Sequence, residues 1–187
     1  MAEDAASEIG SILSDFVQSG AYSGLGGLSR GIDWSHASLE EKTAVRDAYM
    51  ATEQMRAASQ KMKFFGYASD GIGGMNATAI VLGGGGGGAV LSHTDGETKG
   101  VGFAFGSGGA QIGGSTDFLF VGYRGRPSEF WGLFHGAFGG VHFGIGVTVI
   151  TAHLGAGYAS EWEALIMAVG VGAGGAVAGF VGGAWVY

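Results

Sequence analysis

Glycine is the feature that most constrains how this chain folds: it occupies 41 of the 187 positions, and 35 of these glycines follow residue 65. Glycine averages about 7% of residues in proteins, so this chain carries roughly three times the usual share. The glycines keep no three-residue period and Pro127 is the single proline, which excludes a collagen helix. Hydrophobic residues make up 47% of the sequence and charged residues 13%, which argues against a disordered chain.

After residue 65, the glycines alternate with large apolar residues at a period of two. Val101, Phe103 and Phe105 are each separated by glycine or alanine, and the same alternation recurs over residues 141–149. A period of two is typical of strands, and glycine in a strand lets another segment approach closely. Turn residues at 95–96, 125–128 and 155–157 separate the runs. We therefore predict an antiparallel sheet or barrel with one face of large side chains and one closely packed face.

The first 65 residues predict helices. Apolar residues recur at helical spacing over residues 3–18, and Gly20 follows as a stop signal. Residues 24–31 predict a loop. Ser38 and Glu41 match a capping box that starts a helix running to about residue 65. The predicted fold is α+β and mainly β: a helical N-terminal arm (1–65), then a compact glycine-rich antiparallel sheet or barrel (66–187).

Two long uncharged stretches leave an alternative open. Residues 130–160 and 164–187 contain no Asp, Glu, Lys or Arg, and each is long enough to span a bilayer as a helix. The second stretch spaces glycines four apart, as in close-packed membrane helices. Against this alternative, the glycines alternate at period two, and each would cost a helix about 1 kcal/mol relative to alanine.

No pattern in the sequence favours catalysis. The glycine run at 83–88 lacks the Gly-Lys-Ser/Thr of a phosphate-binding loop, and no Gly-x-Ser-x-Gly elbow occurs. The histidines at 36, 93, 135, 142 and 153 show no metal-ligand spacing, and cysteine is absent. We predict a protein that is not an enzyme and has no cofactor or metal. A formal net charge of −7 argues against nucleic acid as a partner.

Basic residues beside aromatic ones suggest a different partner. Such a combination suits an anionic membrane surface, where each cation contributes about 1 kcal/mol. The candidate lipid-binding residues are Arg56, Lys61, Lys63, Phe64 and Phe65 near the end of the second predicted helix, with Arg124 and Arg126 near a later turn. Acidic residues are interleaved along the same helix, so a solvated helix face is the competing interpretation. The acidic start of the chain lacks signal-peptide features, so we expect a cytoplasmic protein, peripheral to a membrane.

Residues 83–121 resemble the SYLF (Ysc84-like) lipid-binding domain family. The resemblance lies in a glycine-rich strand pair, then Gly109, Gln111 and Gly113, then Asp117-Phe118; residues 177–183 also look like the family's closing strand. It implies a β-rich lipid-binding module that acts, in eukaryotic members, on phosphoinositides and actin-associated membranes. It also implies lipid contact through a basic N-terminal helix, a role that falls here on Lys61, Lys63 and Arg56. The basic stretch usual before the first strand is replaced by residues 67–80, which contain no Lys or Arg.

The sequence thus predicts non-enzymatic, peripheral binding of anionic lipid or phosphoinositide, with actin or another protein as an additional partner. A self-assembling structural protein, forming homo-oligomers through its glycine-bare faces, is one alternative. A membrane-inserting glycine-zipper pore is the other.

Overall fold

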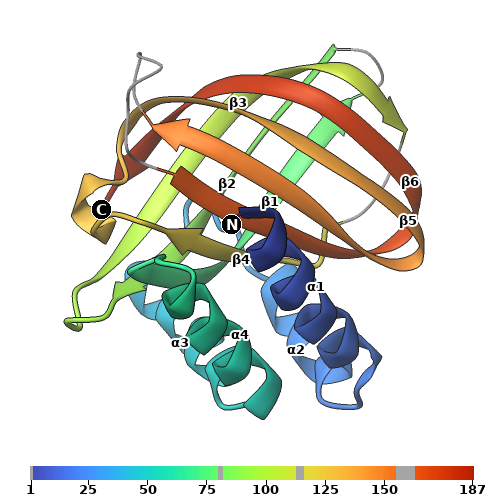
Figure 1. The fold of residues 1–187 in the computed structure, drawn as a ribbon. Coiled ribbons are helices and arrows are strands. Elements are labelled where there is room, and N and C mark those ends of the chain that lie inside the picture. The colour runs from blue at the N-terminus through green and yellow to red at the C-terminus, as the bar shows by residue number, and fades with distance from the viewer. Residues whose placement is uncertain (1, 80–81, 113–115, 155–162) are drawn as a thin grey trace.

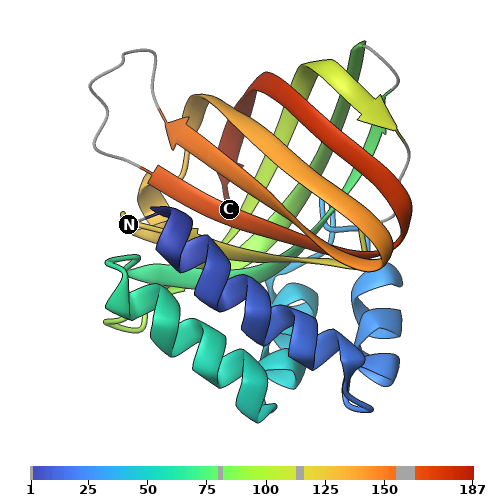
Figure 2. The ribbon, with the colours of Figure 1, turned by 45° about the vertical axis from the view of Figure 1, so that its right-hand side comes forward.

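The chain folds into a helical layer packed against one side of a β-barrel (Figure 1). The structure, a computed structural model, describes residues 2–79, 82–112, 116–154 and 163–187. Four helices come first and lie together on one side of the barrel, as the turned view also shows (Figure 2). The predicted order of N-terminal helices followed by antiparallel strands is confirmed.

Four helices form the N-terminal part of the chain, and one of them, α3, begins at the predicted start signal. They are α1 (Ala2–Gln18), α2 (Tyr22–Arg30), α3 (Leu39–Met50) and α4 (Glu53–Phe64). The predicted capping box is present at α3, where the Ser38 hydroxyl accepts a hydrogen bond from the backbone N–H of Glu41 at 3.2 Å. The Glu41 carboxylate in turn accepts from the backbone N–H of Ser38 at 2.9 Å, so both N–H groups are satisfied.

The predicted loop at residues 24–31 is wrong, because most of this segment belongs to α2. Three glycines within α2 disfavour a helix by about 1 kcal/mol each. Docking on the barrel compensates: Tyr22 and Ser29 are buried, the Tyr22 hydroxyl donates to the Asp117 carboxylate, and the Ser29 hydroxyl donates to the Asp117 carbonyl oxygen. The helix is therefore stabilised by tertiary contacts that local propensity does not reveal.

The single helix predicted from residue 39 to about 65 is also wrong, since it is broken between α3 and α4. Thr52 has an extended backbone (φ −82°, ψ 147°) and caps α4 by accepting a hydrogen bond from the N–H of Met55. Its hydroxyl also donates to the Tyr49 carbonyl oxygen at 2.7 Å. Threonine is a good N-cap because its hydroxyl satisfies free backbone groups at a helix start.

The strands form one antiparallel sheet in the order β3-β2-β1-β4-β6-β5, with β3 and β6 also paired. They are β1 (Ser69–Ala79), β2 (Leu82–His93), β3 (Thr98–Ile112), β4 (Phe118–Tyr123), β5 (Gly132–Leu154) and β6 (Glu163–Val186). A short 3-10 helix, η1 (Pro127–Glu129), lies between β4 and β5. Because β5 and β6 are strands, the alternative of two glycine-zipper membrane helices is wrong.

The barrel closes because its two longest strands bend. The first part of β6 pairs with β4 (Phe118↔Val169), and its last part pairs with β3 (Val101↔Val186). Strand β5 follows β6 along its whole length and folds back on itself (Figures 1 and 2). A methyl group placed on Gly136 would overlap the Thr151 carbonyl oxygen, so the two halves of β5 lie side by side. Each bent strand supplies two segments, and the closed barrel has eight.

Period two divides the strand residues between the barrel interior and its outer surface. Large inward side chains, including Phe103, Phe134 and Phe180, fill the interior with Tyr123 and Leu119. Outward residues on β1, β4 and the first part of β6 pack with α1, α3 and α4 in a second core. On β3 and the last part of β6, the large side chains face the inside of the barrel and the glycines face its outer surface. On β1 and the second half of β5 the order is reversed: Ile72, Val147 and Val149 face the helices, while Gly71 and Gly73 face the interior.

Two buried polar contacts attach the helical layer to the barrel. Asp117, just before β4, holds α2: besides Tyr22, its carboxylate binds the Arg30 guanidinium at 2.9 Å. Burial, followed by the hydrogen bond to Asp117, raises the pKa of Tyr22. Lys42 of α3 is fully buried, and its ammonium lies 4.3 Å from the centre of the Tyr187 ring. Among the described residues, no hydrogen-bond partner for this ammonium is found, and burial lowers the pKa of Lys42 to about 8.

Candidate functional site

The predicted basic residues of α4 lie near its end, but some of them are engaged with other parts of the chain. Lys61 forms an ion pair with Glu8 of α1 at 2.6 Å. The Arg56 guanidinium donates to the Ala51 carbonyl oxygen at 2.9 Å, at the end of α3. Lys63 and Phe64 are exposed, with 78% of Phe64 accessible, whereas Phe65 packs partly on the helical core.

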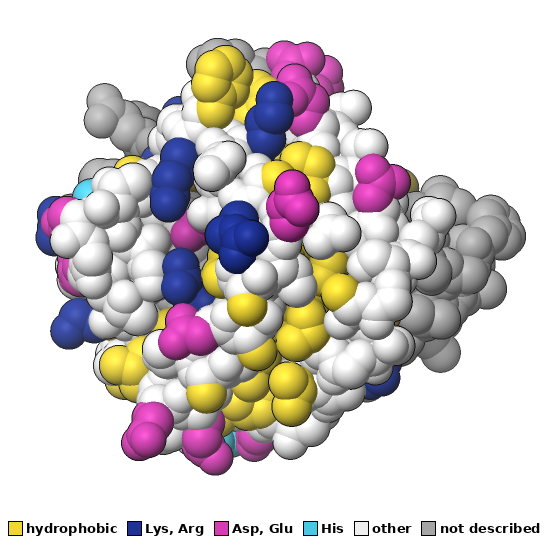
Figure 3. Space-filling model, turned by 90° about the horizontal axis from the view of Figure 1, so that it is seen from below, with side chains coloured by type: hydrophobic (Ala, Val, Ile, Leu, Met, Phe, Trp, Pro, Cys, Tyr) yellow, Lys and Arg dark blue, Asp and Glu magenta, His cyan; other side chains and the backbone are white. Residues whose placement is uncertain are grey.

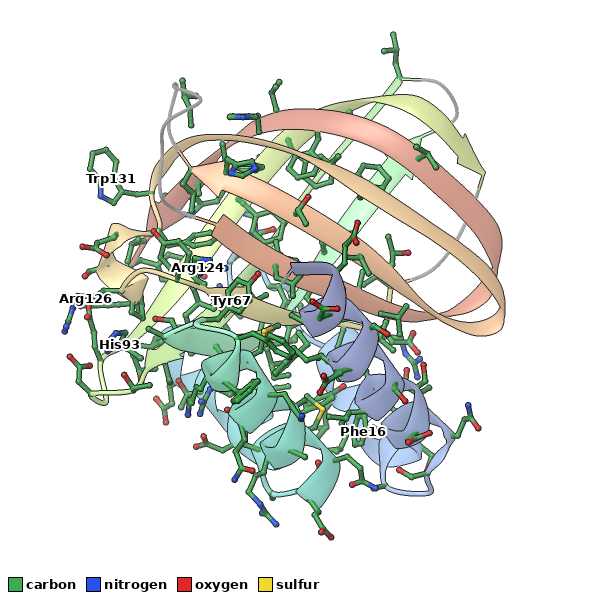
Figure 4. The ribbon with its side chains drawn as sticks, in the orientation of Figure 1. Phe16, Tyr67, His93, Arg124, Arg126 and Trp131 are labelled. Carbon is green, nitrogen blue, oxygen red and sulfur yellow. The ribbon has the colours of Figure 1, made fainter. Side chains whose placement is uncertain are left out.

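The predicted residues of the later turn are also held by neighbours. The Arg124 guanidinium lies 4.9 Å from the centre of the Tyr67 ring, which follows α4. Arg126 binds Asp95 at 2.6 Å and Glu97 at 2.8 Å, in the turn between β2 and β3. Figure 4 shows Tyr67, Arg124 and Arg126 at the same end of the barrel. The fold thus brings Arg124 next to the residues that follow α4, while Arg126 pairs with the neighbouring turn.

The acids around Arg126 are strongly stabilised as carboxylates. The backbone N–H of Glu97 is the largest cause that lowers the pKa of Asp95 to about 2, and His93 and Arg126 add to it. The Ser128 hydroxyl, followed by Arg126, lowers the pKa of Glu97. Arg126 therefore neutralises local acids and offers less positive charge to a ligand than its sequence position suggests.

Figure 3 shows the helical side of the molecule, where basic and acidic side chains are interspersed. Such a surface has no strong field of one sign and attracts an anionic membrane weakly. Charge on the helices therefore does not by itself identify a binding surface.

The charges of the β region are concentrated at one end of the barrel. Residues 71–92, 100–116, 130–160 and 164–187 contain no Asp, Glu, Lys or Arg. Apart from the buried Asp117, the described charged residues of this region lie near the β2–β3 turn, the β4–β5 turn or the start of β6. We call this the charged end; its members are Asp70, Asp95, Glu97, Lys99, Arg124, Arg126, Glu129 and Glu163.

The outer surface away from the helices is apolar and uncharged. We call it the apolar wall, formed by the outward side chains of residues 82–86, 100–108, 131–139 and 177–187. Nine large hydrophobic side chains are exposed among the described residues, and all but Leu28 and Phe64 lie in this wall. The seven are Leu82, Trp131, Leu133, Val177, Val181, Trp185 and Tyr187; the last lies at the border with α3, where its ring faces Lys42. A monomeric soluble protein rarely exposes so many neighbouring apolar side chains without a binding role.

Glycine shapes this wall. Trp185 lies opposite Gly102 in the β3–β6 pairing, and a methyl group on Gly102 would overlap the indole ring. On Gly100, a methyl group would lie 2.7 Å from the Tyr187 ring. Both rings therefore lie against the strand because β3 has no side chain beneath them.

The wall also changes in character along its length. Trp131, Trp185 and Tyr187 lie toward the charged end, and Trp131 projects from the barrel there (Figure 4). Val181 and then Val177 follow along β6 away from that end. Aromatic side chains next to charges, with aliphatic ones beyond, match the order that membrane proteins show from headgroups to acyl chains.

Sequence reasoning did not select these seven residues. The signal was present as the bare alternate face of the strands and as the uncharged stretches 130–160 and 164–187. Those stretches did not reveal which face of each strand points outward, because the face of large side chains and the glycine-rich face are both apolar. The basic side chains near the end of α4 were predicted as the binding residues instead.

The described residues offer little else to a ligand. They contain no group of three or more His, Cys, Asp or Glu side chains that could hold a metal ion. Within the same residues, no helix has the length and apolar character needed to cross a bilayer. Comparisons with models of protein families, with curated proteins and with solved structures give no match.

Proposed function

We propose that this protein is a non-enzymatic, peripheral membrane-binding module whose apolar wall contacts the lipid. The observation that carries the proposal is that seven of the nine exposed large hydrophobic side chains lie on this one uncharged wall. Fully burying a side chain of this size contributes about 1.5–3 kcal/mol, so several together support stable binding.

Three features of the wall favour a lipid layer over a protein partner. Its residues include few groups that could direct hydrogen bonds to a specific partner, since glycine, alanine and valine predominate. Strands β2, β3 and the last part of β6 are each paired on both sides, so this part of the wall offers no strand edge for sheet extension. Along β6, the wall passes from Val177 and Val181 to Trp185, so an aliphatic part is followed by an aromatic part, as in proteins that meet acyl chains and headgroups.

The predicted anionic-lipid contact is a separate part of the proposal. Lys63 and Phe64 are exposed at the end of α4, and Arg124 lies close to the residues that follow it. These groups would add a salt-sensitive attraction to anionic headgroups. The resemblance to the SYLF family supports the same class of ligand.

The test is vesicle flotation with wall variants. Val177→Lys combined with Val181→Lys places two charges in the wall, and it should reduce binding to phosphatidylcholine vesicles by at least about 50-fold, since each charge must stay hydrated. Leu28→Lys, at an exposed apolar position on α2, is the matched control and should bind like the parent chain. Binding of the double variant at the level of the parent chain would show that the wall is not the contact.

Salt separates the two contacts. Binding through the wall should persist at high salt on neutral vesicles. Lys61→Glu combined with Lys63→Glu should weaken binding only on anionic vesicles at low salt. Analytical ultracentrifugation of the same variants tests the alternative of self-assembly. An oligomer that the wall charges dissociate, together with no flotation on any vesicle, would replace the membrane proposal with self-assembly.

A further inference from the structure

The buried ammonium of Lys42 lies where α3 meets the apolar wall. Lys42 is fully buried, and its ammonium has no hydrogen-bond partner within the described part of the chain. A methyl group placed on Gly88 of β2 would lie 2.9 Å from this nitrogen, so the ammonium lies directly above the backbone of β2. A buried charge without a partner is costly, so an anionic acceptor that reached this nitrogen would bind strongly.

The charged groups around Lys42 are engaged with other residues. Asp33, whose charge acts on Lys42 through space, is paired with His36 at 2.9 Å. Arg46, one turn along α3, lies 3.6 Å from the carboxylate of Asp70. Lys42 therefore offers one positive charge that no neighbour neutralises. This charge matches a carboxylate, whereas a phosphate monoester would leave a second charge buried and unpaired.

Tyr187 separates this ammonium from the apolar wall. The centre of its ring lies 4.3 Å from the Lys42 nitrogen. The backbone of Tyr187 is fixed, because its N–H donates to the Gly100 carbonyl oxygen at 2.9 Å and its carbonyl oxygen accepts from the Gly100 N–H at 3.1 Å. Tyr187 is 42% exposed, so its ring can turn and open the ammonium to the wall while the strand pairing stays intact.

A bare strip of the wall runs from this position along β2 and β3. We call it the glycine strip; its outward residues are Gly84 and Gly86 on β2, and Ala104, Gly106 and Gly108 on β3. Methyl groups on Gly84 and Gly106 would meet only the backbone of the neighbouring strand, so no side chain lies over these positions. The exposed side chains of Val177 and Val181 on β6 follow one side of the strip.

We propose that the glycine strip binds one long-chain fatty acid, whose carboxylate pairs with Lys42 and whose acyl chain lies along the strip against Val181 and Val177. The strip has room for one chain: the six residues from Gly88 to Leu82 cover about 20 Å of strand, and an acyl chain in one leaflet spans about 15 Å. Residues 71–92, 100–116 and 177–187 contain no Asp, Glu, Lys or Arg that would oppose an apolar chain. The inference goes beyond the proposed function and does not depend on it.

The experiment measures equilibrium binding of radiolabelled palmitate to the purified chain without vesicles. Hexadecanol, which has the same chain length without the carboxylate, is the comparison ligand. The parent chain should bind one palmitate at saturation and hexadecanol about 10- to 100-fold more weakly, because a hydrogen-bonded charge is lost. Lys42→Met should lower the affinity for palmitate to that for hexadecanol. Lys99→Met is the matched control and should keep the parent affinity, because Lys99 lies on the same face of β3 as Val101, which is buried inside the barrel.

A second variant tests the strip without changing Lys42. Gly106→Leu places a side chain in the path of the acyl chain and should lower the affinity for palmitate about tenfold. Gly24→Leu on α2 adds the same side chain at another uncovered glycine and should bind palmitate like the parent chain. Circular dichroism verifies that each variant is folded.

Three results would overturn the inference: no saturable binding of palmitate by the parent chain, equal affinities for palmitate and hexadecanol, or parent-level palmitate binding by Lys42→Met. Flotation on vesicles that contain no fatty acid is measured separately. Flotation together with any of these three results would leave the proposed function intact, whereas saturable palmitate binding without flotation would leave only the fatty-acid site.

Discussion

The two sides of the barrel use the same glycine-rich strands in opposite ways. On the helix-covered side, the space above the glycines is filled: the Trp34 ring lies over Gly74, and Met62 lies over Gly122. On the apolar wall the same residue type faces open space, and a methyl group on Gly183 would meet nothing within 4 Å. Covered glycines therefore serve packing of the helical layer, whereas wall glycines leave a smooth outer surface.

This difference shows that glycine content alone does not define a function. What distinguishes the two sides is whether the chain supplies its own cover. The helices bury the outward apolar residues of β1, β4 and the start of β6, and leave those of the first part of β2, β3 and the end of β6 uncovered.

Removing the attachment of the helical cover should have the largest effect. Asp117→Ala takes away the acceptor of Tyr22 and the partner of Arg30, so we expect a loss of about 2–4 kcal/mol in the free energy of unfolding. Urea denaturation followed by circular dichroism measures it. Asp33→Ala is the matched control: its partner His36 is exposed, and no measurable change is expected. Equal stability of the two variants would mean that Asp117 does not anchor α2.

A matched pair of glycine substitutions tests the comparison directly. Gly74→Ala should destabilise the protein by about 2–3 kcal/mol, because the added methyl group overlaps the buried Trp34 ring. Gly183→Ala should leave stability unchanged or raise it by about 0.5 kcal/mol, because it restricts only the unfolded chain. Thermal and urea unfolding of both variants provide the measurement, and a similar loss in both would show that the wall is as tightly covered as the helical side.

Replacing Lys42 should give the smallest change in the free energy of unfolding, and this change should depend on pH. Because burial holds its pKa near 8 in the folded protein, below the ordinary 10.5, the folded state binds fewer protons than the unfolded state between these values. The contribution of Lys42 to stability therefore rises with pH across this window. Lys42→Met should stabilise the protein by about 1–2 kcal/mol below pH 8, where the buried ammonium is charged.

The same gain should shrink as pH approaches 10.5, because the amine of the parent chain is then neutral in both states. Denaturation of the two proteins in parallel, from neutral to alkaline pH, reports the difference. A gain that stays constant with pH would indicate that Lys42 is not charged and desolvated in the folded protein. The cation–aromatic contact with Tyr187 offsets part of the gain.

Local patterns were enough to predict α1, the cap at Ser38 and the alternation of the strands. They failed at α2, because its stability depends on Asp117, which lies 95 residues beyond Tyr22. They failed at Thr52, which fits the spacing of a continuous helix as well as it fits an N-cap. Closure of the barrel depends on bends within β5 and β6, and neither bend has a proline or a charged residue that would mark it in the sequence.

For the candidate site, sequence could predict a bare strand face but not its direction. Whether Phe103 or Gly102 points into the barrel depends on which face the chain can cover, and that is decided by the packing of the helices. The contact between the rings of His135 and His153, whose centres are 5.6 Å apart, likewise depends on the fold of β5, because the two residues are 18 positions apart.

The pairing of β6 with β3, β4 and β5 has a consequence for how the chain folds. The β3–β6 and β4–β6 pairings that close the barrel join distant parts of the sequence, such as Val101 with Val186. The chain must therefore lose loop-closure entropy before these contacts form, and folding should be slow compared with a helical protein of this size. Before β6 docks, β3 and β4 expose unpaired edges and the inner phenylalanines contact water. Such an intermediate is prone to aggregate, which makes early assembly of the helices on β1 a means of keeping the half-formed sheet in solution.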